Sequence, residues 1–268
     1  MRVRVALVLI LLLGFAAWGV LRAQKPFKEY PGVEYTDFPL PPDYQKPAEW
    51  IRGRLRYHDT GRRGFRRGAG AWTTDYPRSD RHFLEGVRRL TRIDSRSVEQ
   101  VVDADGSDDL YNWPFVYAVE VGQWVLSDAE ARQIRDFLDR GGFLMVDDFH
   151  GTNEWSIFID SMVKIFPDKS IVDLADNEPI FHNIYDLEHR VQVPGAQYLR
   201  SGRTYEKDGF EARWRGIYDD KHRLQVVICH NMDLGDAWEW SDDPRYPEAW
   251  ASLAYRIGMN YIVYDLTH

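Results

Sequence analysis

Three polar side chains that could bind a metal or move a proton follow one apolar run in this chain. Asp147, Asp148 and His150 come directly after the run from Phe143 to Val146. Carboxylates and an imidazole together are ligands for a divalent metal, or they form an acid/base pair. In the alternative interpretation, Asp148 and Thr152 cap the next helix and His150 is a solvated loop residue.

A second polar stretch follows another apolar run near the C-terminus. It has several potential oxygen ligands around Gly235, and it consists of Asn231, Asp233, Asp236, Trp238 and Glu239. Such oxygens suit a hard cation such as Ca²⁺ or Mg²⁺, although their spacing is not that of an EF-hand loop. The alternative is a turn with a buried tryptophan. We expect this stretch to face the first one.

The elements around these residues predict an α/β fold. Ser127 and Glu130 form a capping box before a helical stripe that ends at Gly141. The apolar run 143–146 is typical of a strand buried on both faces, and a helical stripe from Trp155 to Phe166 follows it. This alternation predicts a mainly parallel, doubly wound sheet. A hairpin formed by 213–218 and 224–229, a last helix and an apolar tail from Tyr261 to Leu266 complete the domain.

Several phrases of the sequence resemble one family. They are R-L-R-Y at 54–57, the segment 72–77, N-W-P-F-V-Y at 112–117, G-G-F-L-M-V-D-D at 141–148, N-M-D-L-G-D-A-W-E at 231–239 and G-M-N-Y-I-V-Y-D-L-T-H at 258–268. These phrases are similar to the bacterial domain of unknown function 4159 (DUF4159). The resemblance implies a class I glutamine amidotransferase-like or flavodoxin-like fold, and no established activity.

Amidotransferase-like folds commonly carry a cysteine nucleophile, and this chain has one cysteine, Cys229. It ends a predicted strand with His230 adjacent and hence pointing the opposite way, whereas a nucleophile sits in a turn between strand and helix. The strand end that should host that turn carries Asp147 and Asp148. We therefore expect a domain that lacks the nucleophile.

The N-terminal segment predicts export to the cell envelope. Arg2 and Arg4 precede an uncharged apolar run from Val5 to Leu21. Residues 1–23 are therefore expected to be a signal peptide or an N-terminal transmembrane helix. Residues 24–50 are rich in proline and are interpreted as a linker, which leaves 51–268 as a single α/β domain in the periplasm or another extracytoplasmic compartment.

Arginines concentrate where the predicted domain begins. Between residues 52 and 67 there are seven arginines and one acid, Asp59. Arg54 and Arg56 are candidates for binding an anion, and a solvated loop is the alternative. The whole chain has a net charge of −8, which excludes a nucleic-acid footprint over most of its surface.

Two functions remain open from the sequence. The first is a non-catalytic scaffolding or ligand-binding domain of the envelope, whose acidic crevice binds a small polar or sugar-like molecule. The second is a hydrolase assisted by a divalent metal, with Asp147, Asp148 and His150 as ligands or acid/base groups and Asp233, Asp236 and Glu239 completing the site. In both, an uncleaved N-terminal segment would attach the protein to the membrane.

Overall fold

A seven-stranded sheet forms the centre of the molecule in the computed structural model, which describes residues 25–30, 38–61 and 70–268. The strand order is β2-β1-β3-β4-β7-β6-β5. The first five strands in that order pair in parallel, and β6 pairs antiparallel with β7 and with β5. The strands are β1 (Arg52–Arg56), β2 (Gln100–Asp103), β3 (Phe115–Val119), β4 (Phe143–Asp147), β5 (Val172–Asp173), β6 (Arg213–Tyr218) and β7 (Leu224–His230).

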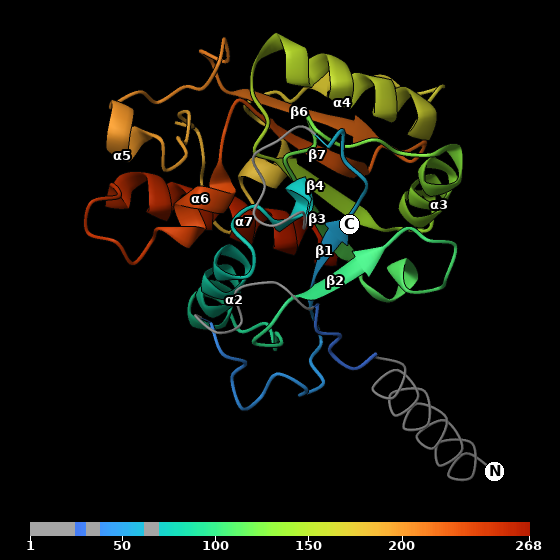
Figure 1. The fold of residues 1–268 in the computed structure, drawn as a ribbon, viewed down its shortest axis with the longest axis horizontal. Helices are drawn as coiled ribbons and strands as arrows, with labels where there is room; N and C mark the ends of the chain where they lie inside the picture. Colours follow the sequence, from blue (N-terminus) through green and yellow to red (C-terminus); the bar gives the residue numbers. More distant parts are fainter. Residues whose placement is uncertain (1–24, 31–37, 62–69) are drawn as a thin grey trace, which may run out of the picture.

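Helices cover both faces of the sheet (Figure 1). One hydrophobic core lies under α3 (Asp128–Asp139) and α4 (Gly151–Ile165). The other lies under α2, α6 and α7, whose bounds are Arg78–Leu90, Leu234–Glu239 and Glu248–Thr267. Short helical turns complete the chain, namely η2 (Ala71–Thr73), η3 (Leu110–Asn112), η4 (Pro179–Phe181) and α5 (Tyr198–Ser201). The prediction of an α/β protein is confirmed.

Local signals in the sequence located several elements well. Strand β3 has the predicted bounds, and the capping box is present: the Glu130 backbone N–H donates to the Ser127 hydroxyl at 3.3 Å. The hairpin of β6 and β7 is also present. The apolar tail differs from the prediction, because residues 261–266 continue helix α7. Tyr261, Ile262 and Tyr264 are buried in the core between that helix and the sheet, whereas Leu266 is exposed.

Parts of the segment interpreted as a linker contact the domain. The Tyr30 hydroxyl donates to Asp103 Oδ2 at 3.1 Å, and Trp50 is fully buried beside Phe115. Within the described ranges, no helix combines the length and apolar character needed to span a membrane. The predicted signal or anchor at residues 1–23 lies outside the described residues.

The carboxyl ends of the parallel strands share one edge of the sheet. The loop after β1 leads to Asp75, the loop after β3 begins with Glu120, and the loop after β4 begins with Asp148. The last strand, β7, leads through Asn231 into α6. This edge therefore collects polar residues from four separate connections.

Candidate metal centre

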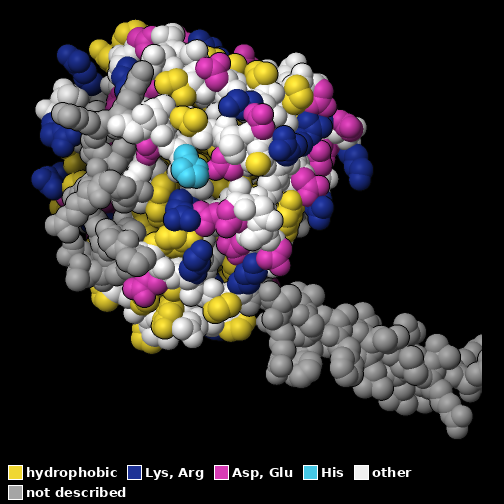
Figure 2. Space-filling view, turned by 45° about the vertical axis from the view of Figure 1, so that its right-hand side comes forward, with side chains coloured by type: hydrophobic (Ala, Val, Ile, Leu, Met, Phe, Trp, Pro, Cys, Tyr) yellow, Lys and Arg dark blue, Asp and Glu magenta, His cyan; other side chains and the backbone are white. Residues whose placement is uncertain are grey.

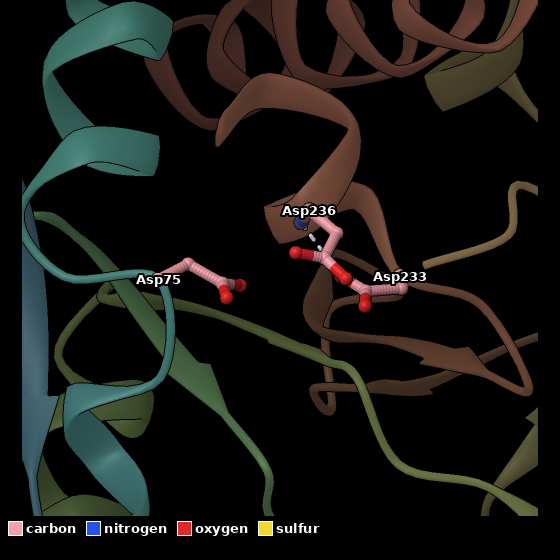
Figure 3. Close-up of side chains that lie close together, drawn as sticks. All are labelled: Asp75, Asp233 and Asp236. Atoms are coloured by element: carbon pink, nitrogen blue, oxygen red, sulfur yellow. Dashed lines mark hydrogen bonds between the residues drawn. The ribbon is translucent and has the colours of Figure 1, made fainter. Parts of the chain in front are cut away.

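Three aspartates from two distant segments meet at this carboxyl edge. Asp75 lies between η2 and α2, whereas Asp233 and Asp236 lie at the start of α6. One carboxylate oxygen of each lies within 4.8 Å of the others. Figure 3 shows the Asp75 carboxylate pointing across a gap toward the other two. Carboxylate oxygens at this separation could bind one hard divalent cation.

Hydrogen bonds to backbone N–H groups fix the conformation of the turn that carries Asp233 and Asp236. The Asp233 carboxylate caps α6 by accepting the backbone N–H of Asp236 at 2.7 Å. Asp236 Oδ2 accepts the backbone N–H of Ala196 at 2.5 Å. Gly235 lies between them without a side chain, and a Cβ there would lie only 2.6 Å from Asp75 Oδ2. This glycine therefore allows Asp75 to approach the turn.

Asp147 lies against the same turn and is completely buried. Its Oδ2 accepts hydrogen bonds from the backbone N–H groups of Leu234 and Gly235, at 2.9 and 3.0 Å, and from the Tyr117 hydroxyl at 3.0 Å. Its Oδ1 is buried and has no hydrogen-bond partner. Burial raises the pKa of Asp147 to about 6, although these donors oppose the shift. Buried carboxylate oxygens normally have a polar partner, which a water or a cation could supply to this oxygen.

The acids of this edge perturb one another. Burial, followed by the charges of Asp148 and Asp236, raises the pKa of Asp233 well above its ordinary value. The pKa of Asp75 is raised in the same direction by burial and then by the charges of Asp236 and Glu239. Mutual repulsion among carboxylates disfavours their charged forms unless a cation neutralises them. The cluster therefore has the electrostatic character of a cation site.

Asp148 and His150 extend the site on one side. His150 Nε2 lies 3.2 Å from Asp148 Oδ1, and His150 is 3% exposed. Burial lowers the pKa of His150, so the imidazole is neutral at pH 7. Burial and the charges of Glu206 and Asp236 raise the pKa of Asp148 well above its ordinary value. This pair could exchange or hold a proton beside the cluster.

A lysine supplies positive charge next to this pair. Lys207 Nζ donates to Glu154 Oε1, and Glu154 Oε2 accepts the backbone N–H of His150 at 2.7 Å. Acidic side chains also gather near the centre of one face of the molecule, with lysine or arginine side chains beside them (Figure 2). The acidic residues of this edge therefore have a positive charge beside them, that of Lys207, which is bonded to Glu154.

Backbone conformation singles out the same region. Among the described residues, six non-glycine residues have a positive φ. One of them, His222, lies in the β6–β7 turn, and the others surround the carboxyl edge: Asp75, Glu120, Asp148, Lys207 and Asn231. Left-handed backbone is costly for such residues and is concentrated at functional sites.

The remaining predicted crevice residues have different environments. Asn231 connects loops, because its Oδ1 accepts the Gly151 N–H at 2.9 Å and its Nδ2 donates to the Glu211 carbonyl at 2.7 Å. Burial and then the charge of Asp236 raise the pKa of Glu239 to about 7. Trp238 is fully buried, with its ring centroid 4.4 Å from that of Phe83, so it supports the site from the core and does not line it.

The two arginines predicted to bind an anion are already bonded within the fold, and the charge of Arg54 acts on Asp75 from the buried side by lowering its pKa against the effect of burial. Arg54 is fully buried, and it donates to Asp80 Oδ2 at 2.9 Å and to the Trp72 carbonyl. These internal bonds leave its guanidinium no surface for a ligand. Arg56 is partly exposed and bonds Asp103 Oδ1 at 2.5 Å. It lines a separate cavity of about 1290 Å³ together with acidic and basic side chains.

Sequence reasoning missed Asp75, the third carboxylate of the cluster. The available signal was its position in the phrase W-T-T-D-Y-P, in the connection that follows the first strand. A loop at the carboxyl end of a parallel strand belongs to the same edge as the loops after β4 and β7. Cys229 lies outside the site: it is fully buried, and burial raises its thiol pKa well above the ordinary value.

These features define an α/β protein with an acidic centre at the carboxyl edge of its sheet. Residues 54–266 match the family described as Domain of unknown function (DUF4159), so the chain belongs to that family. A search of curated proteins found no significant match to the chain. The chemistry of the site must therefore be argued from its own residues.

Proposed function

We propose that this protein is a ligand-binding domain whose functional centre is a divalent cation held by Asp75, Asp233 and Asp236. The observation that carries the proposal is the convergence of these carboxylates within 4.8 Å beside Asp147, whose buried Oδ1 has no partner. A hard cation would neutralise the cluster and would supply the electrostatic partner that the carboxylates lack.

Such a cation would also determine the class of ligand. Ca²⁺ accepts six to eight oxygen ligands and Mg²⁺ six, which exceeds the three carboxylates, so coordination positions stay open. Hydroxyl or carboxylate oxygens of a small polar or sugar-like molecule would fill them. A polyanion such as nucleic acid would be repelled by the uncompensated acids around the site.

We further propose that the domain acts in the cell envelope. The support is the basic start and the apolar run at residues 5–21, which would export the chain or attach it to the membrane. A full-length chain should appear in the membrane or periplasmic fraction, and a variant lacking residues 2–23 should stay in the cytoplasm. If the full-length chain and the truncated variant were distributed equally between the fractions, the proposed location in the cell envelope would be contradicted.

The proposed fold relationship is to a class I glutamine amidotransferase-like domain without its nucleophile. In support, the chain's one cysteine, Cys229, is fully buried, with a thiol whose pKa is raised by burial. The strand end at β4 carries Asp147 and Asp148 in the place of a nucleophile turn. A thiol reagent should therefore leave ligand binding by the folded protein unchanged.

One observation favours a second function, metal-assisted hydrolysis. The neutral imidazole of His150 lies 3.2 Å from Asp148 Oδ1, so it could accept a proton from a water bound to the cation. Hydrolysis of p-nitrophenyl esters or phosphates should then require the cation and should be lost in both His150→Ala and Asp75→Asn. Turnover that persists in either variant would exclude this mechanism.

The cation itself is tested by titration. The full-length protein, freed of metal with a chelator, should bind one equivalent of Ca²⁺, Mg²⁺ or Mn²⁺ by calorimetry. At about 100 times Kd, the cation should stabilise the fold by about 2.7 kcal/mol. Asp75→Asn should abolish binding, whereas Asp168→Asn, at an exposed acid paired with Arg135, should leave it unchanged. Absence of binding by the wild-type protein at millimolar concentrations would refute the proposal.

A further inference from the structure

An unsatisfied amide lies next to the proposed cation. Gln197 precedes the short helix α5, and its Oε1 and Nε2 are both buried without a hydrogen-bond partner. A primary amide offers two donors and one acceptor oxygen, and burying them unpaired is costly. Such a group in a folded protein indicates a ligand, an ion or a water at that position.

The loop that carries Gln197 is attached to the turn that carries the aspartates. The Asp233 N–H donates to the Val193 carbonyl at 3.0 Å, and the Ala196 N–H donates to Asp236 Oδ2 at 2.5 Å. The Tyr246 hydroxyl also holds this loop, because it donates to the Pro194 carbonyl at 2.5 Å. The position of Gln197 relative to the acids is therefore determined by several independent bonds.

Three side-chain oxygens converge beside Gly195 in this loop. A Cβ placed on Gly195 would lie 2.4 Å from Asp233 Oδ2, 2.8 Å from Asp236 Oδ2 and 2.9 Å from Gln197 Oε1. These oxygens belong to different side chains and approach one another because Gly195 has no side chain. The Gln197 amide oxygen thus lies beside the two carboxylates, one of which also accepts the Ala196 N–H.

We infer that Gln197 Oε1 is the fourth oxygen ligand of the cation and that the cation is Ca²⁺. This inference rests on the proposed function. Ca²⁺ accepts amide carbonyls together with carboxylates in an irregular shell, whereas Mg²⁺ requires near-octahedral geometry and keeps most of its water. One oxygen of each carboxylate lies within 4.8 Å of the others, a spread that can be spanned by a cation with oxygen contacts of about 2.3–2.6 Å.

The ligand set has a structural consequence. Its members come from three connections that are far apart in the sequence, at residues 75, 197 and 233–236. A single Ca²⁺ would therefore tie the loop before α2 to the loop before α5 and to the start of α6. Because those loops border the open coordination positions, calcium would shape the surface that the polar ligand meets.

The test compares three side chains at position 197 in the full-length, chelator-treated protein. Calorimetric titration with CaCl₂ should show Kd raised about tenfold or more in Gln197→Ala, because one oxygen ligand is lost. Gln197→Glu supplies a carboxylate oxygen and should bind Ca²⁺ at least as tightly as the wild type. Gln45→Ala, at an exposed glutamine, is the matched control and should leave Kd unchanged.

Each outcome separates this inference from the proposed function. Unchanged Ca²⁺ affinity in Gln197→Ala, with binding still abolished by Asp75→Asn, would overturn the role of Gln197 and leave the cation site in place. Tighter binding of Mg²⁺ than Ca²⁺ by the wild type would overturn the calcium assignment. No cation binding by the wild type would refute the proposed function as well. If Gln197→Ala does not fold, weaker Ca²⁺ binding by Gln197→Glu than by the wild type overturns the inference.

Discussion

Two groups of charged side chains, one fully buried and one partly buried, differ in how their charges are balanced. Beneath the sheet, Asp80 on α2 lies between two arginines of β1: Arg52 Nε at 3.3 Å and Arg54 Nη1 at 2.9 Å. All three side chains are fully buried. At the carboxyl edge, Asp75, Asp233 and Asp236 face one another, and among the described residues none of them forms an ion pair with a lysine or an arginine.

In the balanced group, charges of opposite sign lie together, although Arg52 contacts Asp80 as an ion pair without a hydrogen bond. The Arg52 guanidinium also lies 3.9 Å from the centroid of the Tyr117 ring and 4.7 Å from that of Phe83, so aromatic faces complete its surroundings. In the acidic group, the fold places negative charges together. Their repulsion lowers the stability of the fold unless a cation binds. The two groups therefore differ in the sign of the neighbouring charges: each arginine of the first group has an acidic partner, whereas the acids of the second group mainly face one another, with the charge of Arg54 acting on Asp75.

Breaking the balanced group should have the largest effect. Asp80→Asn removes the carboxylate that Arg52 and Arg54 share, and it leaves two buried guanidinium groups without an anion. We expect the free energy of unfolding to fall by about 3–5 kcal/mol, measured by urea denaturation. Asp168→Asn, at an exposed acid, is the control and should change it by less than about 1 kcal/mol. Similar values for both variants would contradict the contrast between the groups.

A second change alters the geometry of the acidic group without altering its charge. A methyl group in Gly235→Ala would lie 2.6 Å from Asp75 Oδ2 and 2.9 Å from the Tyr117 hydroxyl, so Asp75 must move away. We expect a loss of stability of about 1–3 kcal/mol from overpacking, together with weaker cation binding by calorimetry. Unchanged Kd in the folded variant would show that Asp75 is not a ligand.

A partly buried acid outside both groups, Asp265 in α7, sharpens the comparison. Burial raises the pKa of Asp265 to about 7, and the charge of Arg223 opposes this shift. The protonated acid therefore contributes stability at low pH, and this contribution is lost as the pH rises from about 4 through 7. Because Asp265 is only partly buried, we expect a loss of about 1–2 kcal/mol.

Asp265→Asn should remove this pH dependence. The difference in unfolding free energy between the variant and the wild type should grow from near zero at pH 4 to its full value at pH 8, in favour of the variant. Denaturation curves at both pH values, recorded with and without a chelator, provide the measurement. A variant that is less stable than the wild type at pH 8 would show that the ionised carboxylate is stabilised by Arg223.

The sequence predicted the parts of the fold that depend on local signals or on the parallel pairing of strands. The capping box at Ser127 and the buried run of β4 are local, and the meeting of the stretches after β4 and β7 follows from parallel pairing. Arg54 was predicted as a candidate for binding an anion, but it lies on β1, which has a strand on each side and whose first four residues are buried. Asp75 and Gln197 were missed because their loops reach the site only through tertiary contacts.

The smallest expected effect is, like that of Asp265→Asn at pH 8, an increase in stability. Asp75→Asn removes one of the mutually repelling acids, and asparagine tolerates the left-handed backbone at this position, where φ is 61°. In the presence of a chelator, the free energy of unfolding should therefore be unchanged or raised by up to about 1 kcal/mol at pH 8. Saturating Ca²⁺ should stabilise the wild type and leave the variant unaffected. If Asp75→Asn without metal lost as much stability as Asp80→Asn, the Asp75 charge would have to be compensated within the fold, and the distinction between the two groups would be wrong.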